Sequence, residues 1–206
     1  MEQKGKKVIL GIAGEVASGK DTIARYYQKK YGAGMYRFSD VLRDILHRLH
    51  IPESRKNLAE ASLMIRKTFG EDVFAKAIVE EIERDSREFI VIDGVRRRSD
   101  VAGIESLPGF RLLYISADQK KRHTRLTERK QNVDDSTKTY EEFLRDSELE
   151  SELEIRKLFD GADFLIENNA GLDELYAEAD RVFREAGAKG GRKLHWPWKT
   201  VWKNKE

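Results

Sequence analysis

Two glycines five residues apart, followed at once by a lysine, constrain this sequence more than any other feature. They are Gly14, Gly19 and Lys20, and they follow a short apolar run from Val8 to Ala13. An apolar, β-branched run of this kind is typical of a buried parallel strand. A loop that wraps phosphate groups must turn its backbone N–H groups inward, and glycine tolerates the dihedral angles that this requires. The order therefore predicts a strand, a phosphate-binding loop and a helix.

The same residues form the Walker A spacing of ATP-binding proteins, which assigns a role to each of them. The helix after the loop presents its N-terminus to the anion, and the Lys20 ammonium is expected to reach the β- and γ-phosphates. Asp21 stands where the standard motif has the Ser or Thr that binds Mg²⁺, so Thr22 supplies the nearest hydroxyl. The alternative is an accidental glycine turn. We predict an ATP site made by Gly14, Ala17, Ser18, Gly19, Lys20, Asp21 and Thr22.

A second apolar strand, Phe89 to Ile92, ends in Asp93 and Gly94. An apolar strand closing on Asp is a Walker B pattern, in which the carboxylate orders the water around Mg²⁺ beside the phosphate-binding loop. An Asp-Gly pair after a strand can also be only a turn. We therefore predict that Thr22 and Asp93 hold Mg²⁺, directly or through water.

The remaining pattern alternates strands and helices along the chain. Helical spacing covers 19–30, 40–50 and 56–84, with a break at Gly70, and further strands are expected at 37–39, 110–115 and 164–166. Strands separated by helices of this length predict the α/β class, with a parallel sheet and right-handed crossovers.

The span from Gln119 to Glu154 is mostly charged, basic at first and then acidic. Its first part places Arg122, Arg125 and Arg129 on one helix face, because they are spaced by three and four residues. We interpret the span as a helical flap that stands off the core. A solvated pair of helices is the alternative.

Composition excludes several classes of protein. The 206 residues suffice for one sizeable core, and the absence of cysteine excludes disulfides and thiolate metal sites. A net charge of +2 gives no reason to expect a nucleic-acid partner. No apolar run approaches the roughly 18 residues of a membrane span. We expect a cytoplasmic protein without a membrane or nucleic-acid partner.

Taken together, the motifs resemble those of P-loop nucleoside monophosphate kinases. The run from Asp93 to Arg97 is similar to the Asp-Gly-Phe-Pro-Arg of adenylate kinases, and the run from Ser39 to Arg43 is similar to their Thr-Gly-Asp-Met-Leu-Arg. Phage deoxynucleoside monophosphate kinases share the Gly-Lys-Asp-Thr of residues 19–22. From Val8 to about Ala186, order and spacing look like the archaeal-type proteins described as related to dephospho-coenzyme A kinase and adenylate kinase.

The resemblance implies a division of the chain and a role for each motif. The three-layer P-loop NTPase fold would carry a helical acceptor-binding insertion and a helical lid. The implied P-loop kinase domain spans 1–186, with a core at 7–45, 88–118 and 156–186, acceptor-binding helices at 45–85 and a lid at 119–155.

The resemblance also implies the site residues. Asp40, Arg43 and Arg97 would bind the acceptor, although Asp40 could equally be a helix cap and Arg97 part of a solvated basic turn. The transfer itself would depend on Lys20, Asp93, Arg125, Arg129 and Arg145. Arg122 and Asn169 would join the ATP site; Asn169 could also be an ordinary strand end.

These residues lead us to expect an ATP-dependent kinase that transfers the γ-phosphoryl group to a nucleoside or deoxynucleoside monophosphate. Dephospho-coenzyme A kinase is the nearest alternative, with Asp40 as the general base for a ribose hydroxyl. A non-catalytic ATP-dependent switch or assembly factor is the alternative from another class.

The tail, residues 187–206, is not covered by the resemblance. It is basic and contains Trp196, Trp198 and Trp202. It could pack on its own core, dock on a second subunit, or lie on nucleic acid or a membrane. The net charge favours docking on protein, which makes a homodimer formed through the tail a candidate assembly.

Overall fold

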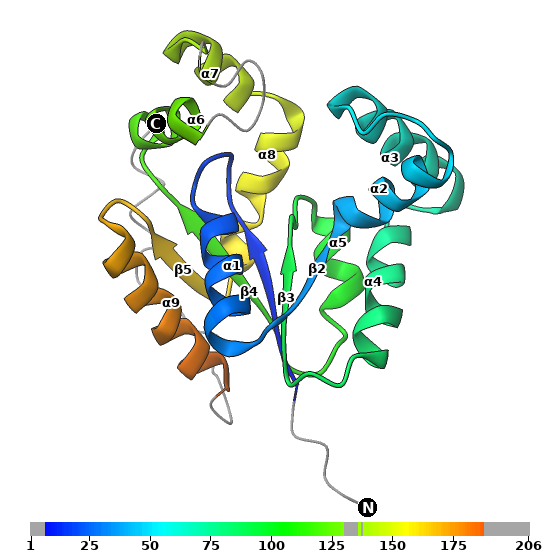
Figure 1. Cartoon of the computed structure of the whole chain (residues 1–206), viewed down its shortest axis with the longest axis horizontal. Coiled ribbons are helices and arrows are strands. Elements are labelled where there is room, and N and C mark those ends of the chain that lie inside the picture. Colours follow the sequence, from blue (N-terminus) through cyan, green and yellow to red (C-terminus); the bar gives the residue numbers. More distant parts are fainter. Residues whose placement is uncertain (1–6, 130–135, 137, 188–206) are drawn as a thin grey trace, which may run out of the picture.

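A five-stranded parallel sheet organises the chain, in the computed structural model that describes residues 7–129, 136 and 138–187. The strand order is β2-β3-β1-β4-β5, and every neighbouring pair is parallel (Figure 1). The strands are β1 (Val8–Ala13), β2 (Gly34–Arg37), β3 (Phe89–Asp93), β4 (Phe110–Ser116) and β5 (Phe164–Glu167).

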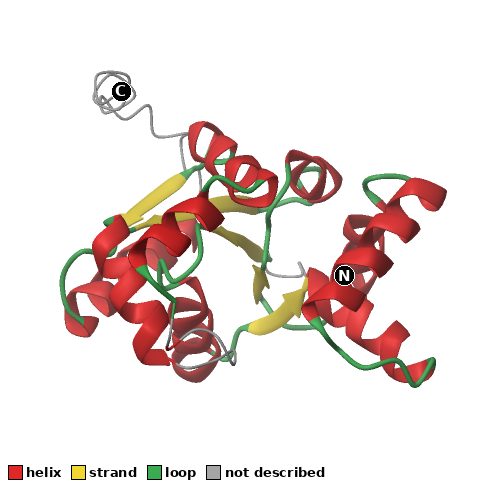
Figure 2. Ribbon diagram, turned by 90° about the horizontal axis from the view of Figure 1, so that it is seen from above, coloured by secondary structure: helices red, strands yellow, loops and turns green. Residues whose placement is uncertain are grey.

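Helices cover both faces of the sheet, which makes three layers (Figures 1 and 2). Side chains such as Leu10 and Ile12 of β1 point to a core shared with α1 (Lys20–Tyr31) and α9 (Leu172–Gly187). Ile9 points to the opposite core, as the alternation of a strand requires. That core is shared with α2 (Phe38–Arg48), α3 (Arg55–Phe69), α4 (Val73–Arg84), α5 (Arg98–Ile104) and α8 (Glu150–Lys157). The predicted α/β class is confirmed.

Two elements differ from the sequence predictions. The strand expected at 37–39 lies at 34–37, because Phe38 already begins α2 and is buried with Leu42 one turn later. Helix α5 was not predicted, since its apolar residues, Val101 and Ile104, are few and follow a run of arginines. The predicted break at Gly70 is confirmed: α3 ends there, with φ at 104°.

The charged span contains α6 (Gln119–Arg129) and α7 (Tyr140–Ser147), which we call the lid helices. They are anchored on the phosphate-binding loop, because Leu126 and Phe143 form a small buried cluster with Ala17, which is separate from the two main cores. Ile155 of α8, also within the predicted lid, is buried in the main core. These anchors were not predicted, because each is an isolated apolar residue within a strongly charged sequence.

Some sequence predictions lie outside the described residues. These are the tail beyond Gly187 and the part of the predicted lid at 130–135 and 137. Within the described ranges, no helix is long and apolar enough to cross a membrane.

Close packing of α4 against α5 gives a prediction for stability. A Cβ atom on Gly103 would lie 2.4 Å from the Cβ of Ala75, so the two helices would have to separate. We expect Gly103→Ala to destabilise the fold by about 1–3 kcal/mol, despite alanine's higher helix propensity. Urea denaturation measures this. Gly187→Ala is the matched control, because no atom lies within 4 Å of its added Cβ. Equal stability of the two variants would contradict the packing argument.

Candidate nucleotide-binding site

The loop between β1 and α1 has a backbone that only glycine permits at two positions. Gly14 has φ at 156°, and a Cβ there would lie 2.4 Å from the carbonyl oxygen of Ile115 in β4. Gly19 has φ at 104°, and a Cβ there would lie 2.3 Å from Nδ2 of Asn168, just after β5. The loop therefore rests directly on the carboxyl ends of two neighbouring strands.

Between these glycines the loop makes a tight turn. The Ser18 N–H donates to the Glu15 carbonyl at 3.2 Å, and Ala17 adopts a left-handed conformation with φ at 58°. The turn leads into the N-terminus of α1, where the Thr22 N–H donates to the Gly19 carbonyl at 3.1 Å. A helix N-terminus at the end of such a turn is a favourable site for a phosphate group.

A cleft of about 1170 Å³ opens in front of this helix N-terminus. It runs along α1 from the first turn to the last, and α6, the loop from β5 to α9 and the start of α9 form its other walls. Its lining includes Gly19, Lys20, Thr22, Arg125, Asn168 and Ala170. The volume exceeds the roughly 300 Å³ lower bound of small-molecule sites, and the lining combines amides, hydroxyls and cations.

Two opposite charges lie close to the loop. Asp93 at the end of β3 is buried, and its Oδ2 accepts a hydrogen bond from Nε of Arg37 at 2.8 Å. Burial raises the pKa of Asp93, and the Asp21 carboxylate raises it further. Burial likewise lowers the pKa of Lys20. The charged form of Asp93 therefore lacks water, whereas Lys20 is half-buried and lines the cleft, where an anionic ligand would stabilise its charged form.

The predicted Mg²⁺ ligands fit a hard cation. Asp93 Oδ1 and Ser18 Oγ are buried, and neither has a hydrogen-bond partner in the described structure. Thr22 lines the cleft together with Lys20. Oxygen atoms of this kind are the ligands that Mg²⁺ takes, together with water and phosphate oxygens.

Arg125 of α6 is one of the residues that line the cleft. Its Nη2 donates to the carbonyl and to the Oδ1 of Asn168, at 3.0 and 3.3 Å. Its Nη1 is buried and has no partner in the described structure. Asn168 in turn donates from Nδ2 to the Ser18 carbonyl at 2.8 Å, which ties the arginine to the loop. An unpaired buried donor in a polar cleft is costly unless a ligand accepts from it.

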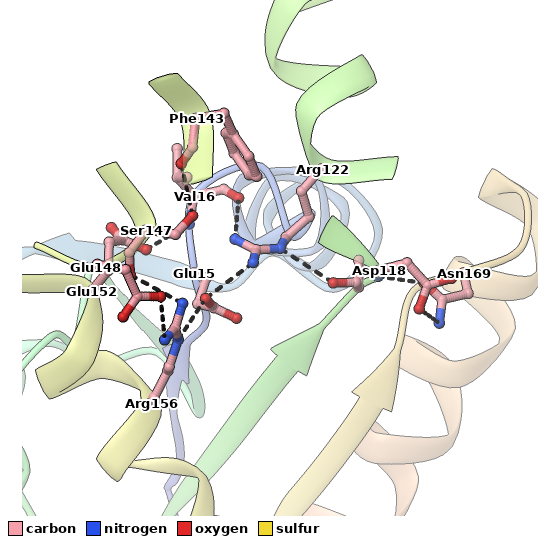
Figure 3. Close-up of polar contacts among 11 residues, drawn as sticks. Glu15, Val16, Asp118, Arg122, Phe143, Ser147, Glu148, Glu152, Arg156 and Asn169 are labelled. Carbon is pink, nitrogen blue, oxygen red and sulfur yellow. Dashed lines mark hydrogen bonds and ion pairs between the residues drawn. The ribbon is translucent and has the colours of Figure 1, made fainter. Parts of the chain in front are cut away.

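Other predicted site residues lie elsewhere. Arg122 is buried with its guanidinium turned toward Glu15 and away from the cleft, because the loop supplies a carboxylate there (Figure 3). Asn169 exchanges hydrogen bonds with the Asp118 backbone N–H and carboxylate, at 2.8 and 3.1 Å. Arg145 is exposed in the last turn of α7. The side chain of Arg129 lies outside the described part of the structure.

The predicted acceptor residues follow the ends of β2 and β3. Asp40 and Arg43 line a second cavity, of about 390 Å³, with Asp44, His47 and Glu53. The Arg43 guanidinium is exposed and lies 2.8 Å from the Glu53 carboxylate. Arg97 is also exposed, and its Nη1 lies 3.3 Å from the Glu71 carboxylate.

The sequence analysis missed the buried ion pair that holds Arg97's loop. Arg66 of α3 donates to Asp100 Oδ1 at 2.8 Å, and Asp100 Oδ2 accepts from the backbone N–H groups of Arg96 and Arg97, each at 3.1 Å. It also missed Asn168 and Glu15. For Glu15 a signal existed, since a carboxylate within an anion-binding loop needs a compensating cation.

Comparisons with known proteins agree with this geometry. The family model described as an AAA domain matches residues 13–143, from the end of β1 to α7. A UPF0200 protein of Saccharolobus islandicus is 31% identical over 178 residues, which cover 85% of this chain and 92% of the relative. The chain belongs to the AAA domain and UPF0200 families.

Other relatives and solved structures extend the comparison of this UPF0200 chain. A UPF0200 protein of Methanothermobacter thermautotrophicus is 27% identical over 187 residues, with 89% and 93% of the two chains covered. Shikimate kinase from Bacteroides thetaiotaomicron has a similar structure, with a TM-score of 0.55 at 15% identity over 86% of this chain and 97% of that one. An uncharacterized protein from Eubacterium ventriosum gives 0.54 at 14% identity, over 89% and 100%. The predicted P-loop kinase-like fold is confirmed.

The buried Asp93 carboxylate predicts an unusual pH dependence. Because its pKa is raised, the folded protein binds this proton more tightly than the unfolded chain does, and the charged form costs stability once pH rises above the ordinary value of about 3.9. We expect Asp93→Asn to raise the Tm at pH 7.5. The gain should disappear as pH falls below about 4. Asp160→Asn, on an exposed residue, is the control. A lower Tm for Asp93→Asn at pH 7.5 would contradict this interpretation.

Proposed function

We propose that this chain is an ATP-dependent kinase that transfers the γ-phosphoryl group to a nucleoside or deoxynucleoside monophosphate. The P-loop kinase-like fold supports a small-molecule kinase. The observation behind the nucleotide-kinase proposal is Arg125: it lines the same cleft as Lys20, and its buried Nη1 has no hydrogen-bond partner in the described structure. A cation on each side of a phosphate site stabilises the charge of the transferring group.

On the donor side, each residue has a task that follows from its position. Backbone N–H groups of the loop and of the α1 N-terminus would hold the β-phosphate, and Lys20 would bridge the β- and γ-phosphates. Arg125 would reach the phosphates from α6. Thr22 and Asp93 would hold Mg²⁺, which supplies further positive charge to the phosphate oxygens when bound.

On the acceptor side, Arg43 and Arg97 would hold the acceptor's phosphate. Each now pairs with a glutamate in an exposed ion pair, at 2.8 and 3.3 Å. Such pairs contribute about 0–1 kcal/mol, so a phosphate dianion can replace the carboxylate at little cost. Arginine matches phosphate oxygens with two parallel hydrogen bonds, which favours a ligand that already bears a phosphate group.

Dephospho-coenzyme A kinase remains the second candidate because of the acidic second cavity. Asp40 and Asp44 line it, and an exposed carboxylate there can accept the proton of a ribose hydroxyl.

A coupled ADP-release screen distinguishes the two candidates. It compares all ribo- and deoxynucleoside monophosphates with dephospho-coenzyme A as the acceptor. ATP consumption that is independent of every acceptor would instead favour a switch or assembly factor.

Lys20 provides the first test of the donor site. We expect Lys20→Ala to fold normally yet to lower turnover by at least about 100-fold, because one charge on the transferring phosphoryl group is lost. The control is Lys76→Ala, an exposed lysine of α4. Steady-state ADP release and circular dichroism measure the two properties. A folded Lys20→Ala enzyme with wild-type turnover would refute the proposal.

Arg43 and Arg97 provide the test of the acceptor site. Replacing either with Ala is expected to raise the KM of the acceptor about 10-fold or more and to leave the KM of ATP nearly unchanged, because a charge-assisted bidentate contact is lost. Arg84→Ala is the matched control, an exposed α4 arginine that also pairs with a glutamate. Equal weakening of ATP and acceptor would show that the two arginines are wrongly assigned.

A further inference from the structure

A carboxylate lies inside the loop that is built to hold anions. Glu15 follows Gly14, and only 13% of its side chain is exposed. Its Oε1 accepts from two guanidinium groups, Nη2 of Arg122 at 3.0 Å and Nε of Arg156 at 3.0 Å (Figure 3). The two arginines therefore offset a negative charge that would otherwise repel phosphate.

Arg122 joins the loop to both lid helices. Its Nη1 donates to the Val16 carbonyl at 3.4 Å and its Nε to the Ala117 carbonyl at 3.2 Å. Its guanidinium carbon also lies 5.3 Å from the centre of the Phe143 ring of α7. Since 2% of the side chain is exposed, Arg122 cannot turn to water if its carboxylate is removed.

Arg156 joins the loop to α8 and to the end of α7. Nη2 of Arg156 donates to the Ser147 carbonyl at 3.0 Å. Beside it, Glu152 Oε2 accepts the backbone N–H of Val16 at 3.1 Å. Two adjacent loop residues, Glu15 and Val16, are thus bound from two helices, α6 and α8, as Figure 3 shows.

The position of Arg125 depends on this arrangement. Arg125 lies three residues after Arg122, one turn along α6, so the orientation of the first turn decides where Arg125 points. Its partners, the carbonyl and Oδ1 of Asn168, constrain only one of its two terminal nitrogens. The Glu15–Arg122 pair is a further constraint on α6, beside the buried side chain of Leu126.

We propose that Glu15 is a positioning residue for phosphoryl transfer. By holding Arg122 it orients α6 so that Arg125 faces the phosphates, and by holding Arg156 it keeps α8 against the loop. This inference rests on the proposed function, because it assigns Arg125 to the transferring phosphoryl group.

The test is Glu15→Gln, which keeps the size of the side chain and removes its charge. We expect kcat/KM for ATP to fall about 10- to 100-fold, the scale of a catalytic group displaced by about 1 Å, with the acceptor KM nearly unchanged. Glu148→Gln is the matched control: Glu148 also pairs with Arg156, at 3.3 Å, but it is exposed and does not touch the loop. It should keep wild-type kinetics.

A double-mutant cycle separates positioning from general stabilisation. If Glu15 acts through Arg122 and Arg156, the loss in kcat/KM of Glu15→Gln combined with Arg122→Met should be smaller than the product of the two single losses, because the contact with Arg122 is lost only once. Fully multiplicative losses in kcat/KM would overturn the proposal. So would a Glu15→Gln protein with a lowered Tm and kinetics within about twofold of wild type, since each pair would then be only structural.

Two further measurements cover a Glu15→Gln variant that does not fold and a wild-type protein without kinase activity. If Glu15→Gln fails to fold, Arg156→Gln removes the less buried partner and should lower kcat/KM for ATP in the same direction; unchanged kinetics would overturn the proposal. If the wild-type protein phosphorylates no acceptor, the proposed function has failed by itself. Titration with a fluorescent ATP analogue then tests Glu15: weaker binding by Glu15→Gln than by Glu148→Gln supports its positioning role, and equal binding overturns it.

Discussion

The close approach of the phosphate-binding loop to the ends of β4 and β5 governs the rest of the site. Gly14 lies against the Ile115 carbonyl and Gly19 against Asn168, with no space for a Cβ at either position. Helix α6 follows β4, and the turn at Asn168 follows β5. The loop therefore contacts the points at which these two cleft-lining segments begin. Small residues at two points thus bring together elements that lie far apart in the sequence.

Charge compensation around the loop follows from that packing. Lys20 follows the loop at the start of α1 and Asp93 ends β3; burial moves the pKa of each toward its neutral form, so each gains when a ligand of opposite charge arrives. Glu15 in the loop and Arg122 beside it lie 3.0 Å apart. Lys20 and Asp93 can therefore gain from a bound ligand, whereas Glu15 and Arg122 already neutralise each other. We assign the first two residues to ligand binding and the second two to the support of the loop.

The motifs of the site could be predicted from the sequence because local backbone geometry determines them. The direction in which individual side chains point could not, because it depends on contacts between residues far apart in the sequence. The Gly14–Lys20 spacing and Asp93 at a strand end are fixed by backbone geometry, so both were found. Arg122 and Arg125 share a helix face, yet Arg122 turns inward because Glu15 lies there, a contact across 107 positions. Asn168 lines the cleft while Asn169 binds Asp118, since the turn after β5 decides which of two equal neighbours points inward.

Burial assigns the arginines of this protein to different tasks. Arg122 and Arg66 are buried beside carboxylates, where removing either partner would leave an uncompensated charge, so these pairs hold backbone segments in place. Arg43 and Arg97 pair with glutamates in water, where exchange of one anion for another costs little. Arg125 lies between these cases, with one nitrogen bound to Asn168 and the other buried and without a partner among the described residues. An unsatisfied donor on an arginine that is held in this way favours a ligand whose negative charge develops at that point, which is the requirement of phosphoryl transfer.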